Sequence, residues 1–594
     1  MSYQTRNDIP TQHKWNLADI FVSTEAWDKE FEQILALLPT FTEYKGKLNN
    51  KKTILEMYKN NDITEERIEK LYCYAYMTYC EDSKNTDSQT RYGKVSTLLS
   101  KMSELLAYVE PEMSKIPDQE LNEMVADKDF ADYSESLKAL IRNKPHVLSE
   151  EQERIVASTG DVTRFFNETF SRLDSGDLDY GSIMVDGKEV KLSHGAYSTL
   201  MQHPDQNVRK LAFERYYKAY IDQVNTISAI YEGSVKSDIF YAKVRKFDSA
   251  MEKATFYENA DKVVYENLIK SINNSFEPLH EYIALRKKLL KVDKLNMYDL
   301  HVPIFANADI AVDYEKAFDM VLEGLAPLGE DYRKLLLTAR NNRWVDVYET
   351  PTKRGGAYSM GVTGVHPFVM LNYQETTHDI FTLAHELGHS MHSHYSSKNQ
   401  PQAKAGYTIF VAEVASTVNE VLLLNYLLAK EKDVNIKKYL LSYYLDMLRT
   451  TMYRQAMFAE FEYIAHKRSE NGEPLSSEVL SNDYYELNKK YYGPSVEHNQ
   501  QIRYEWARIP HFYRAFYVYK YSTGITSAVC IAQRILKEGA PMVAKYKQFL
   551  SLGCSLDPVS ELKVAGVDLT SNVPFDIVKQ SFAETLQQLK ELYE

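Results

Sequence analysis

The chain has 594 residues, of which 44 % are hydrophobic and 26 % are charged, and its formal net charge at pH 7 is −13. This length can bury large cores, and the composition is that of an ordinary globular protein, which excludes collagen-like, low-complexity and wholly disordered classes. The acidic balance, without any Lys/Arg-rich run, argues against nucleic acid as a partner. Uninterrupted apolar runs fall short of the roughly 18 residues that a membrane span needs, so we expect no membrane association.

Helical periodicity dominates the chain from its first element onward. The stretch STEAWDKEFEQILALLP has Ser23 as a candidate cap, carries Trp27, Phe31 and Ile34 on one face and stops at Pro39. Similar patterns recur along most of the chain, and no fixed-period repeat interrupts them. The sequence therefore predicts a mainly α fold.

The first departure from this pattern is SIMVDGKEVKLS, which follows the loop-like LDSGDLDYG. It predicts two short strands joined by a tight turn at Asp186-Gly187. We place a domain boundary there, with an N-terminal domain of residues 1–195 and a second domain of residues 196–594.

The second departure is the glycine-rich TKRGGAYSMGVTGVHPFVMLNYQ, whose run from Phe368 to Tyr373 has the character of an extended segment. A strand there would end close to the histidines that follow, and an exposed edge could pair with an extended peptide through main-chain hydrogen bonds. A plain sheet edge or a glycine-rich connection is the alternative.

The segment FTLAHELGHS places His385 and His389 four residues apart in a predicted helix. Both ring nitrogens can then reach one point on the same face, as a pair of metal ligands does. Glu386 projects beside that point, where it can hold and deprotonate a bound water. Two core histidines are the alternative, but neutral histidines in an apolar helix without partners would be costly.

A catalytic zinc site needs a third protein ligand and leaves a fourth position to water. Glu413 lies 24 residues after His389 in the apolar stretch YTIFVAEVASTVNEVLLLNYLL, and Glu420 follows seven residues later on nearly the same face. One carboxylate could bind the metal while the other fixes the tautomer of a ligand histidine. The spacing alone leaves that choice open.

HELGHSMHS, FVAEVAST and RIPHFYRAFYVYKYSTG resemble the M3 zinc peptidases, the thimet oligopeptidase and neurolysin family, and most closely the bacterial oligoendopeptidase F branch. The resemblance extends over nearly the whole chain, including WNLADIF and DGKEVKLSHGAYSTLM. It implies that His385, His389 and Glu413 bind one Zn²⁺ per chain. It also implies that Glu386 is the general base.

The same resemblance assigns His511 and downstream tyrosines to the oxyanion, whose stabilisation by an aimed donor lowers the barrier to hydrolysis. The family's tyrosine offset falls on Phe516 in this chain. Tyr517 and Tyr521, one helical turn apart, are therefore the predicted donors.

Several wider expectations follow from the resemblance. The fold would be an elongated, two-part helical body with a deep substrate channel, and a small β element would lie near the zinc site. Residues 1–195 would form an N-terminal domain of oligoendopeptidase F type, and residues 196–594 the catalytic domain. The activity would be cytoplasmic cleavage of internal bonds in short oligopeptides.

Two rival functions can be separated from this one. A dipeptide-releasing carboxypeptidase would need a cationic group for the terminal carboxylate of its substrate, and the sequence does not place one. A structural zinc site would be closed by four ligands and would not require Glu386.

Overall fold

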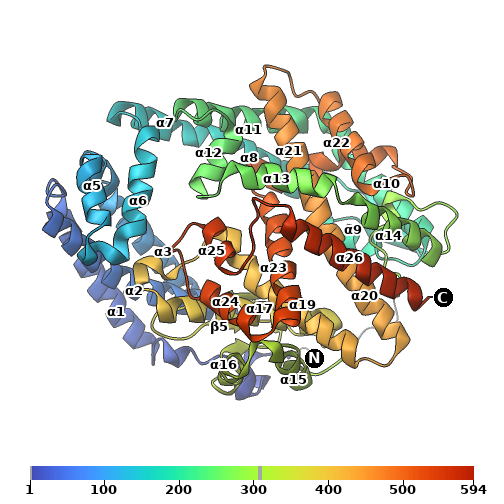
Figure 1. The fold of residues 1–594 in the computed structure, drawn as a ribbon, viewed down its shortest axis with the longest axis horizontal. Coiled ribbons are helices and arrows are strands. Elements are labelled where there is room, and N and C mark those ends of the chain that lie inside the picture. Colours follow the sequence, from blue (N-terminus) through green and yellow to red (C-terminus); the bar gives the residue numbers. More distant parts are fainter. Residues whose placement is uncertain (1–2, 306–310, 594) are drawn as a thin grey trace. The chain divides into compact units, whose positions relative to one another are not determined.

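The computed structural model describes residues 3–305 and 311–593, and helices dominate both compact units of the chain (Figure 1). Unit 1 comprises Met1–Pro145, Ile310–Ala429 and Ile531–Val567, and unit 2 comprises His146–Asp309, Lys430–Cys530 and Asp568–Glu594. The predicted mainly α fold is confirmed. The division after residue 195 follows a sequence pattern rather than packing, and it stays a prediction, as does the substrate channel.

The N-terminal segment of unit 1 is helical throughout its core. Its helices are α1 (Thr24–Leu37), α2 (Lys51–Glu81), α3 (Thr86–Leu106), α4 (Val109–Met113), α5 (Asp118–Val125) and α6 (Ser134–Asn143). Ser23 caps α1 by accepting a hydrogen bond from the Ala26 amide on its hydroxyl oxygen. Trp27, Phe31 and Ile34 are buried against α2 and α3, which confirms the predicted apolar face.

The rest of unit 1 surrounds a small sheet and two long helices. Its elements are α15 (Tyr314–Gly324), α16 (Glu330–Asn341), β3 (Val345–Asp346), β4 (Tyr358–Met360), β5 (Phe368–Met370), α17 (Thr377–Asn399), α18 (Gln402–Ala405), α19 (Ile409–Lys430), α24 (Ala540–Leu550) and α25 (Pro558–Val564). Helix α23 (Tyr519–Glu538) runs from unit 2 into unit 1.

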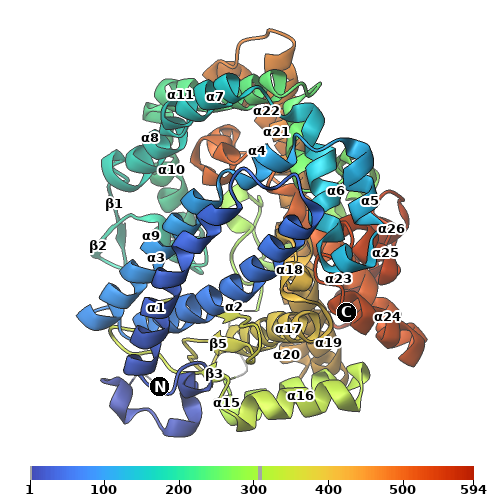
Figure 2. The same cartoon turned by 90° about the vertical axis from the view of Figure 1, so that its left-hand side faces the viewer.

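The order of this sheet corrects one prediction. Strand β5 lies in the middle, parallel to β3 and antiparallel to β4, so the expected exposed edge at Phe368–Tyr373 is wrong. Phe368, Val369 and Met370 are all buried, so both faces of the sheet are covered at this strand. Strand β4 pairs with β5 and is one of the two edge strands of this sheet. Its residues are half-buried. The sheet packs on α17, so the predicted β element close to the histidines is confirmed (Figure 2).

Unit 2 is also helical. Its helices are α7 (Glu150–Thr163), α8 (Phe165–Arg172), α9 (His194–Leu200), α10 (Gln206–Asp222), α11 (Val224–Val244), α12 (Ala250–Tyr257), α13 (Lys262–Asn273), α14 (Phe276–Leu289), α20 (Val434–Leu448), α21 (Arg454–Glu470), α22 (Ser477–Tyr492) and α26 (Val573–Glu591). Strands β1 (Ser182–Val185) and β2 (Lys188–Lys191) form the predicted antiparallel hairpin. Asp186 and Gly187 both have positive φ, as the tight hairpin turn demands.

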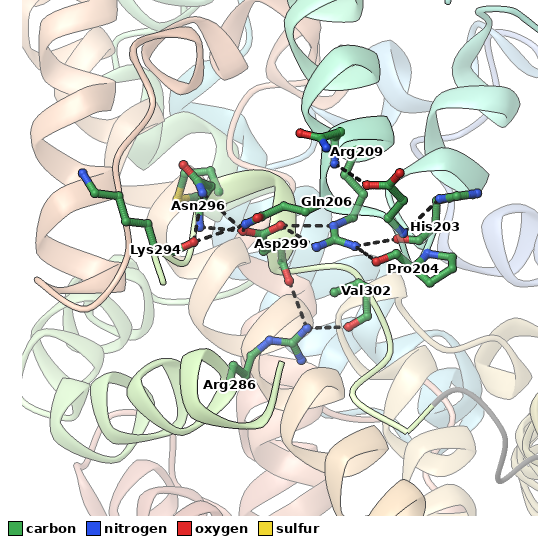
Figure 3. Close-up of polar contacts among 12 residues, drawn as sticks. His203, Pro204, Gln206, Arg209, Arg286, Lys294, Asn296, Asp299 and Val302 are labelled. Carbon is green, nitrogen blue, oxygen red and sulfur yellow. Dashed lines mark hydrogen bonds and ion pairs between the residues drawn. The ribbon is translucent and has the colours of Figure 1, made fainter. Parts of the chain in front are cut away.

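A buried ion pair joins α10 to the segment after α14 (Figure 3). Arg209 donates to Oδ1 of Asp299 through Nε at 3.1 Å and Nη2 at 2.8 Å, and neither side chain is more than 2 % exposed. Oδ2 of Asp299 accepts from the Gln206 side chain at 2.8 Å and the Asn296 amide at 2.8 Å. Every oxygen of this carboxylate therefore has a partner, which is the condition under which a buried charge is tolerated.

Replacing Asp299 by asparagine is expected to lower the free energy of unfolding by about 3 kcal/mol, because the Arg209 guanidinium would stay buried without its counter-charge. Urea denaturation measures the change. Asp222→Asn is the matched control, since its partner Lys218 and Asp222 itself are both more than half exposed and such pairs contribute little. Equal midpoints for the two variants would contradict the prediction.

Candidate metal centre

Helix α17 carries the histidine pair and is fixed at its start by a capping box. Thr376 Oγ1 accepts from the Asp379 amide at 3.3 Å, and Asp379 Oδ2 accepts from the Thr376 amide at 3.0 Å. The helix buries apolar side chains of its own, including Ile380, Leu383 and Leu387. It is a rigid core element that can hold side chains in one geometry.

The two histidines and Glu413 converge on one point. His385 Nε2 and His389 Nε2 are 3.2 Å apart, and Glu413 Oε2 lies 3.3 Å from the first and 3.7 Å from the second. Across residues 3–305 and 311–593, these three form the one group of His, Cys, Asp and Glu side chains whose ligand atoms are placed to hold a metal ion. Two imidazoles and a carboxylate are the donor set of a catalytic zinc site.

Gly388 allows the helix that carries Glu413 to come this close. A Cβ atom on Gly388 would lie 2.5 Å from Ser416 Cα and 2.7 Å from the Ala415 carbonyl oxygen. Both positions are backbone atoms of α19, so no side-chain rotation could relieve the contact. Helices α17 and α19 therefore cross at a separation that only glycine permits at this position.

Glu420 contacts the other nitrogen of His385. Its Oε1 lies 2.5 Å from Nδ1, so Nδ1–H donates to the carboxylate and Nε2 faces Glu413 and His389. This arrangement fixes the ring orientation and raises the basicity of Nε2, as carboxylates behind metal-binding histidines do. Of the two glutamates that the spacing left open, Glu413 reaches the point of convergence and Glu420 supports a histidine from behind.

The electrostatics of this cluster favour a single positive charge at the point of convergence. Burial opposes protonation of His385, but the hydrogen bonds that its ring donates to Glu413 and Glu420 outweigh burial and raise its pKa to about 10. Burial and the charge of His385 lower the pKa of His389 to about 4. The site therefore favours one protonated histidine and disfavours two. A metal ion can take the place of the proton on His385.

Glu386 lies beside this cluster with an unused oxygen. The residue is 7 % exposed, and its Oε2 is buried without a hydrogen-bond partner among the described residues. Burial raises the pKa of Glu386 to about 7, and the charges of Glu413 and Glu420 act in the same direction. A carboxyl group with a pKa near neutrality can take up and release a proton at working pH.

The predicted oxyanion residues gather in unit 2. The ring centroid of His511 lies 6.2 Å from that of Tyr517 and 6.1 Å from that of Tyr521, and the two tyrosine rings are 5.6 Å apart. Burial, with the charges of Arg454 and Arg514, lowers the pKa of His511, so its ring is neutral at pH 7 and one nitrogen carries a proton to donate. The other candidates in this segment serve packing, since Tyr513 stacks on Phe170 and Tyr519 is buried.

Comparisons with known proteins identify the family. The model of peptidase family M3 matches residues 199–580, and the oligopeptidase F model matches residues 112–180. The chain belongs to peptidase family M3. Oligopeptidase PepF of Bacillus subtilis is 42 % identical over 99 % of this chain and 88 % of that protein. A solved structure from Chlamydophila abortus is 30 % identical, has a TM-score of 0.95 and covers 99 % of this chain and 100 % of its own. The structure of oligoendopeptidase-F from Enterococcus faecium is 34 % identical and has a TM-score of 0.73. It covers 96 % of this chain and 99 % of its own.

Membership of family M3 makes the chain a metallopeptidase, a hydrolase of peptide bonds, and the family implies a bound metal. The His-Glu-x-x-His segment and Glu413 provide the candidate site for it.

Helix α19, which supplies Glu413, is long and apolar enough by length and composition alone to cross a membrane. However, 61 % of its most apolar window is buried, and it packs here as a core helix of the M3 peptidase.

Some residues around this M3 site could not be found from the sequence. The Ser390 hydroxyl, which directly follows His389 and is fully buried, lies 2.8 Å from the Ser359 hydroxyl and thereby ties β4 to α17. Serines carry no spacing signal, so this link is visible only in the fold. The glycine at position 388 was part of the motif, but nothing local marked it as a helix crossing.

Glu420→Gln is expected to weaken metal binding by the M3 peptidase, with Zn²⁺ as the probe, about 10-fold or more, because a neutral amide lowers the basicity of His385. Competition with a fluorescent chelator measures the change in affinity. Glu323→Gln, at a side chain more than half exposed, is the control and should leave zinc affinity unchanged. Unaltered zinc affinity in the Glu420 variant would exclude the supporting role of that carboxylate.

Proposed function

We propose that this M3 peptidase is a zinc-dependent endopeptidase that hydrolyses internal bonds of short oligopeptides with Glu386 as general base. The observation that carries the proposal is the convergence of His385 Nε2, His389 Nε2 and Glu413 Oε2, with the unpartnered Glu386 carboxyl beside them. The names of the relatives, oligopeptidase and oligoendopeptidase, support peptides as the substrate class.

The donor set fits one zinc ion per chain. Two neutral imidazole nitrogens and one carboxylate oxygen suit zinc, and three protein ligands leave a position for water. When bound, zinc would polarise the scissile carbonyl and lower the pKa of a water molecule toward 7. His385, His389 and Glu413 would hold it, and Glu420 would orient His385.

The remaining steps belong to side chains of the protein. Glu386 takes a proton from the attacking water on its carboxylate and later delivers it to the leaving amine nitrogen. His511 and Tyr517 or Tyr521 donate hydrogen bonds to the carbonyl oxygen as it becomes an anion. The neutral state of His511 supports this assignment, because a ring nitrogen then carries a proton without adding a second cation.

We further propose that the substrate peptide pairs with strand β4. This strand has β5 on one side, and the Ser359–Ser390 contact holds it against the helix that bears the histidines. An extended peptide added to its other side would run past the proposed metal ligands with its carbonyls in the sheet plane. A narrow channel that admits only short peptides, and a cytoplasmic location, belong to the same proposal.

A digest of peptides of graded length, each with a free or an amidated C-terminus, tests this function. We expect cleavage at internal bonds of both forms, loss of activity after zinc is removed with a chelator, and recovery on adding zinc. Release of dipeptides from free C-termini alone would identify a carboxypeptidase instead. Full activity in the metal-free protein would refute the zinc mechanism.

A further inference from the structure

Phe516 has a backbone conformation that a bulky residue seldom adopts. Its φ is +55°, in the left-handed region that favours glycine. The residue lies in the connection between the short 3-10 helix Pro510–Tyr513 and helix α23, directly before Tyr517. Its conformation therefore sets the direction in which the chain presents Tyr517.

A buried glutamate holds this conformation. The Phe516 amide donates to Glu462 Oε1 at 2.7 Å, and Glu462, on α21, is fully buried. The Phe516 side chain is 2 % exposed and packs on His466 and Tyr265, with ring centroids 4.6 Å and 5.5 Å away. Left-handed backbone of this kind is strained in a residue that carries a Cβ and persists only where the surroundings impose it.

The Glu462 carboxyl acts on Phe516 as a hydrogen-bond acceptor. Burial raises the pKa of Glu462 to about 8, although the charge of His466 and the hydrogen bond from the Phe516 amide both lower it; the Asp238 carboxylate adds to the rise. Glu462 Oε2 has no hydrogen-bond partner among the described residues, so its contact with the Phe516 amide is the polar link from this side chain to the backbone.

We propose that Glu462 is a positioning residue that holds Phe516 in its left-handed conformation and thereby aims the Tyr517 hydroxyl. The inference rests on the proposed function, in which Tyr517 donates to the oxyanion. Tyr517 is flanked by His511 and by the Arg514 guanidinium, 4.1 Å from its ring centroid. A rotation at Phe516 would break this arrangement, although among the described residues no hydrogen bond or ion pair joins Glu462 to the three side chains that define it.

Kinetics of two variants test the inference. Glu462→Met removes the acceptor at similar volume and is expected to lower kcat about 10-fold or more, with KM little changed, because a group needed in the transition state is misplaced. Glu462→Gln keeps a side-chain oxygen that can accept from the Phe516 amide, so it should retain kcat within about 3-fold. Glu561→Met is the matched control, because Glu561 is also buried, has an unpartnered oxygen and a pKa raised to about 8, and should keep kcat unchanged.

A double-mutant cycle ties Glu462 to Tyr517. Tyr517→Phe is expected to lower kcat about 100-fold, as loss of an oxyanion donor does. If Glu462 acts through Tyr517, the double variant with Glu462→Met should be no slower than Tyr517→Phe alone. Additive losses, or a Glu462→Gln variant that loses kcat as much as Glu462→Met, would overturn the inference.

Hydrogen exchange separates this inference from the proposed function. The Phe516 amide should exchange about 10-fold faster in Glu462→Met than in the wild type, and near the wild-type rate in Glu462→Gln. If the Phe516 amide exchanged at the wild-type rate in Glu462→Met, Glu462 would not hold Phe516 in its conformation, whatever value kcat took. An unchanged kcat in Tyr517→Phe would instead remove Tyr517 from the proposed mechanism, and the exchange data would still decide whether Glu462 sets the backbone.

Discussion

Glu386→Gln is expected to lower kcat/KM for an internally quenched peptide by about 10³-fold while the protein keeps one zinc ion per chain. Glutamine has the size of glutamate but cannot accept the proton of the attacking water. The contacts among His385, His389 and Glu413 do not involve the Glu386 side chain, so the metal should stay bound.

Zinc content measured by atomic absorption must accompany these rates, so that lost chemistry is not mistaken for lost metal. Glu478→Gln makes the same chemical change at an exposed position in the first turn of α22 and should leave kcat/KM unaltered. Equal rates for wild type and Glu386→Gln at equal zinc would refute the general-base assignment.

Gly388→Ala is expected to lower kcat/KM by about 100-fold, because displacement of a catalytic group by about 1 Å has an effect of that size. The added methyl would overlap backbone atoms of α19, which must move away and carry Glu413 with it. Zinc affinity should fall together with activity. Overpacking of this kind should also lower the free energy of unfolding by about 1–3 kcal/mol.

Gly93→Ala is the matched control for this variant. Gly93 lies inside helix α3, and a Cβ there would meet no atom within 4 Å. Alanine at this position should leave zinc affinity and kcat/KM unchanged and should stabilise the protein slightly through its helix propensity. If Gly388→Ala behaved like Gly93→Ala, the close crossing of α17 and α19 would not control the metal site.

The histidine pair could be predicted from the sequence because its geometry is local. Four residues along a helix bring two side chains to the same face whatever the rest of the chain does, so His385 and His389 needed no tertiary information. The hairpin around Asp186-Gly187 was predictable for the same reason, since the conformation of a two-residue turn follows from its residues. The choice between Glu413 and Glu420 was open from spacing alone, because their positions depend on how α19 crosses α17.

The sheet is the case where a sequence pattern misled. Phe368–Met370 has the character of a strand, and it is one, but the pattern contains nothing about which strands lie beside it. The glycines before it allow β4 to fold back onto one side of β5, while β3, more than twenty residues upstream in sequence, takes the other. Strand order is a long-range property, and β3 and β4 rather than β5 are therefore the edge strands of this sheet.

The sequence by itself determined the helical class of this chain and the paired imidazoles with a carboxyl beside them. It also supplied Glu413 and Glu420 as candidates for the third metal ligand. Only the tertiary structure decided which carboxylate faces the imidazole nitrogens, which strands form the edges of the sheet and how Phe516 directs Tyr517. The physical reason is that short-range periodicity encodes the direction of a side chain on its own helix or strand. Distances between elements depend instead on contacts such as that of Gly388 with α19 and that of Glu462 with the Phe516 amide, which no local pattern contains.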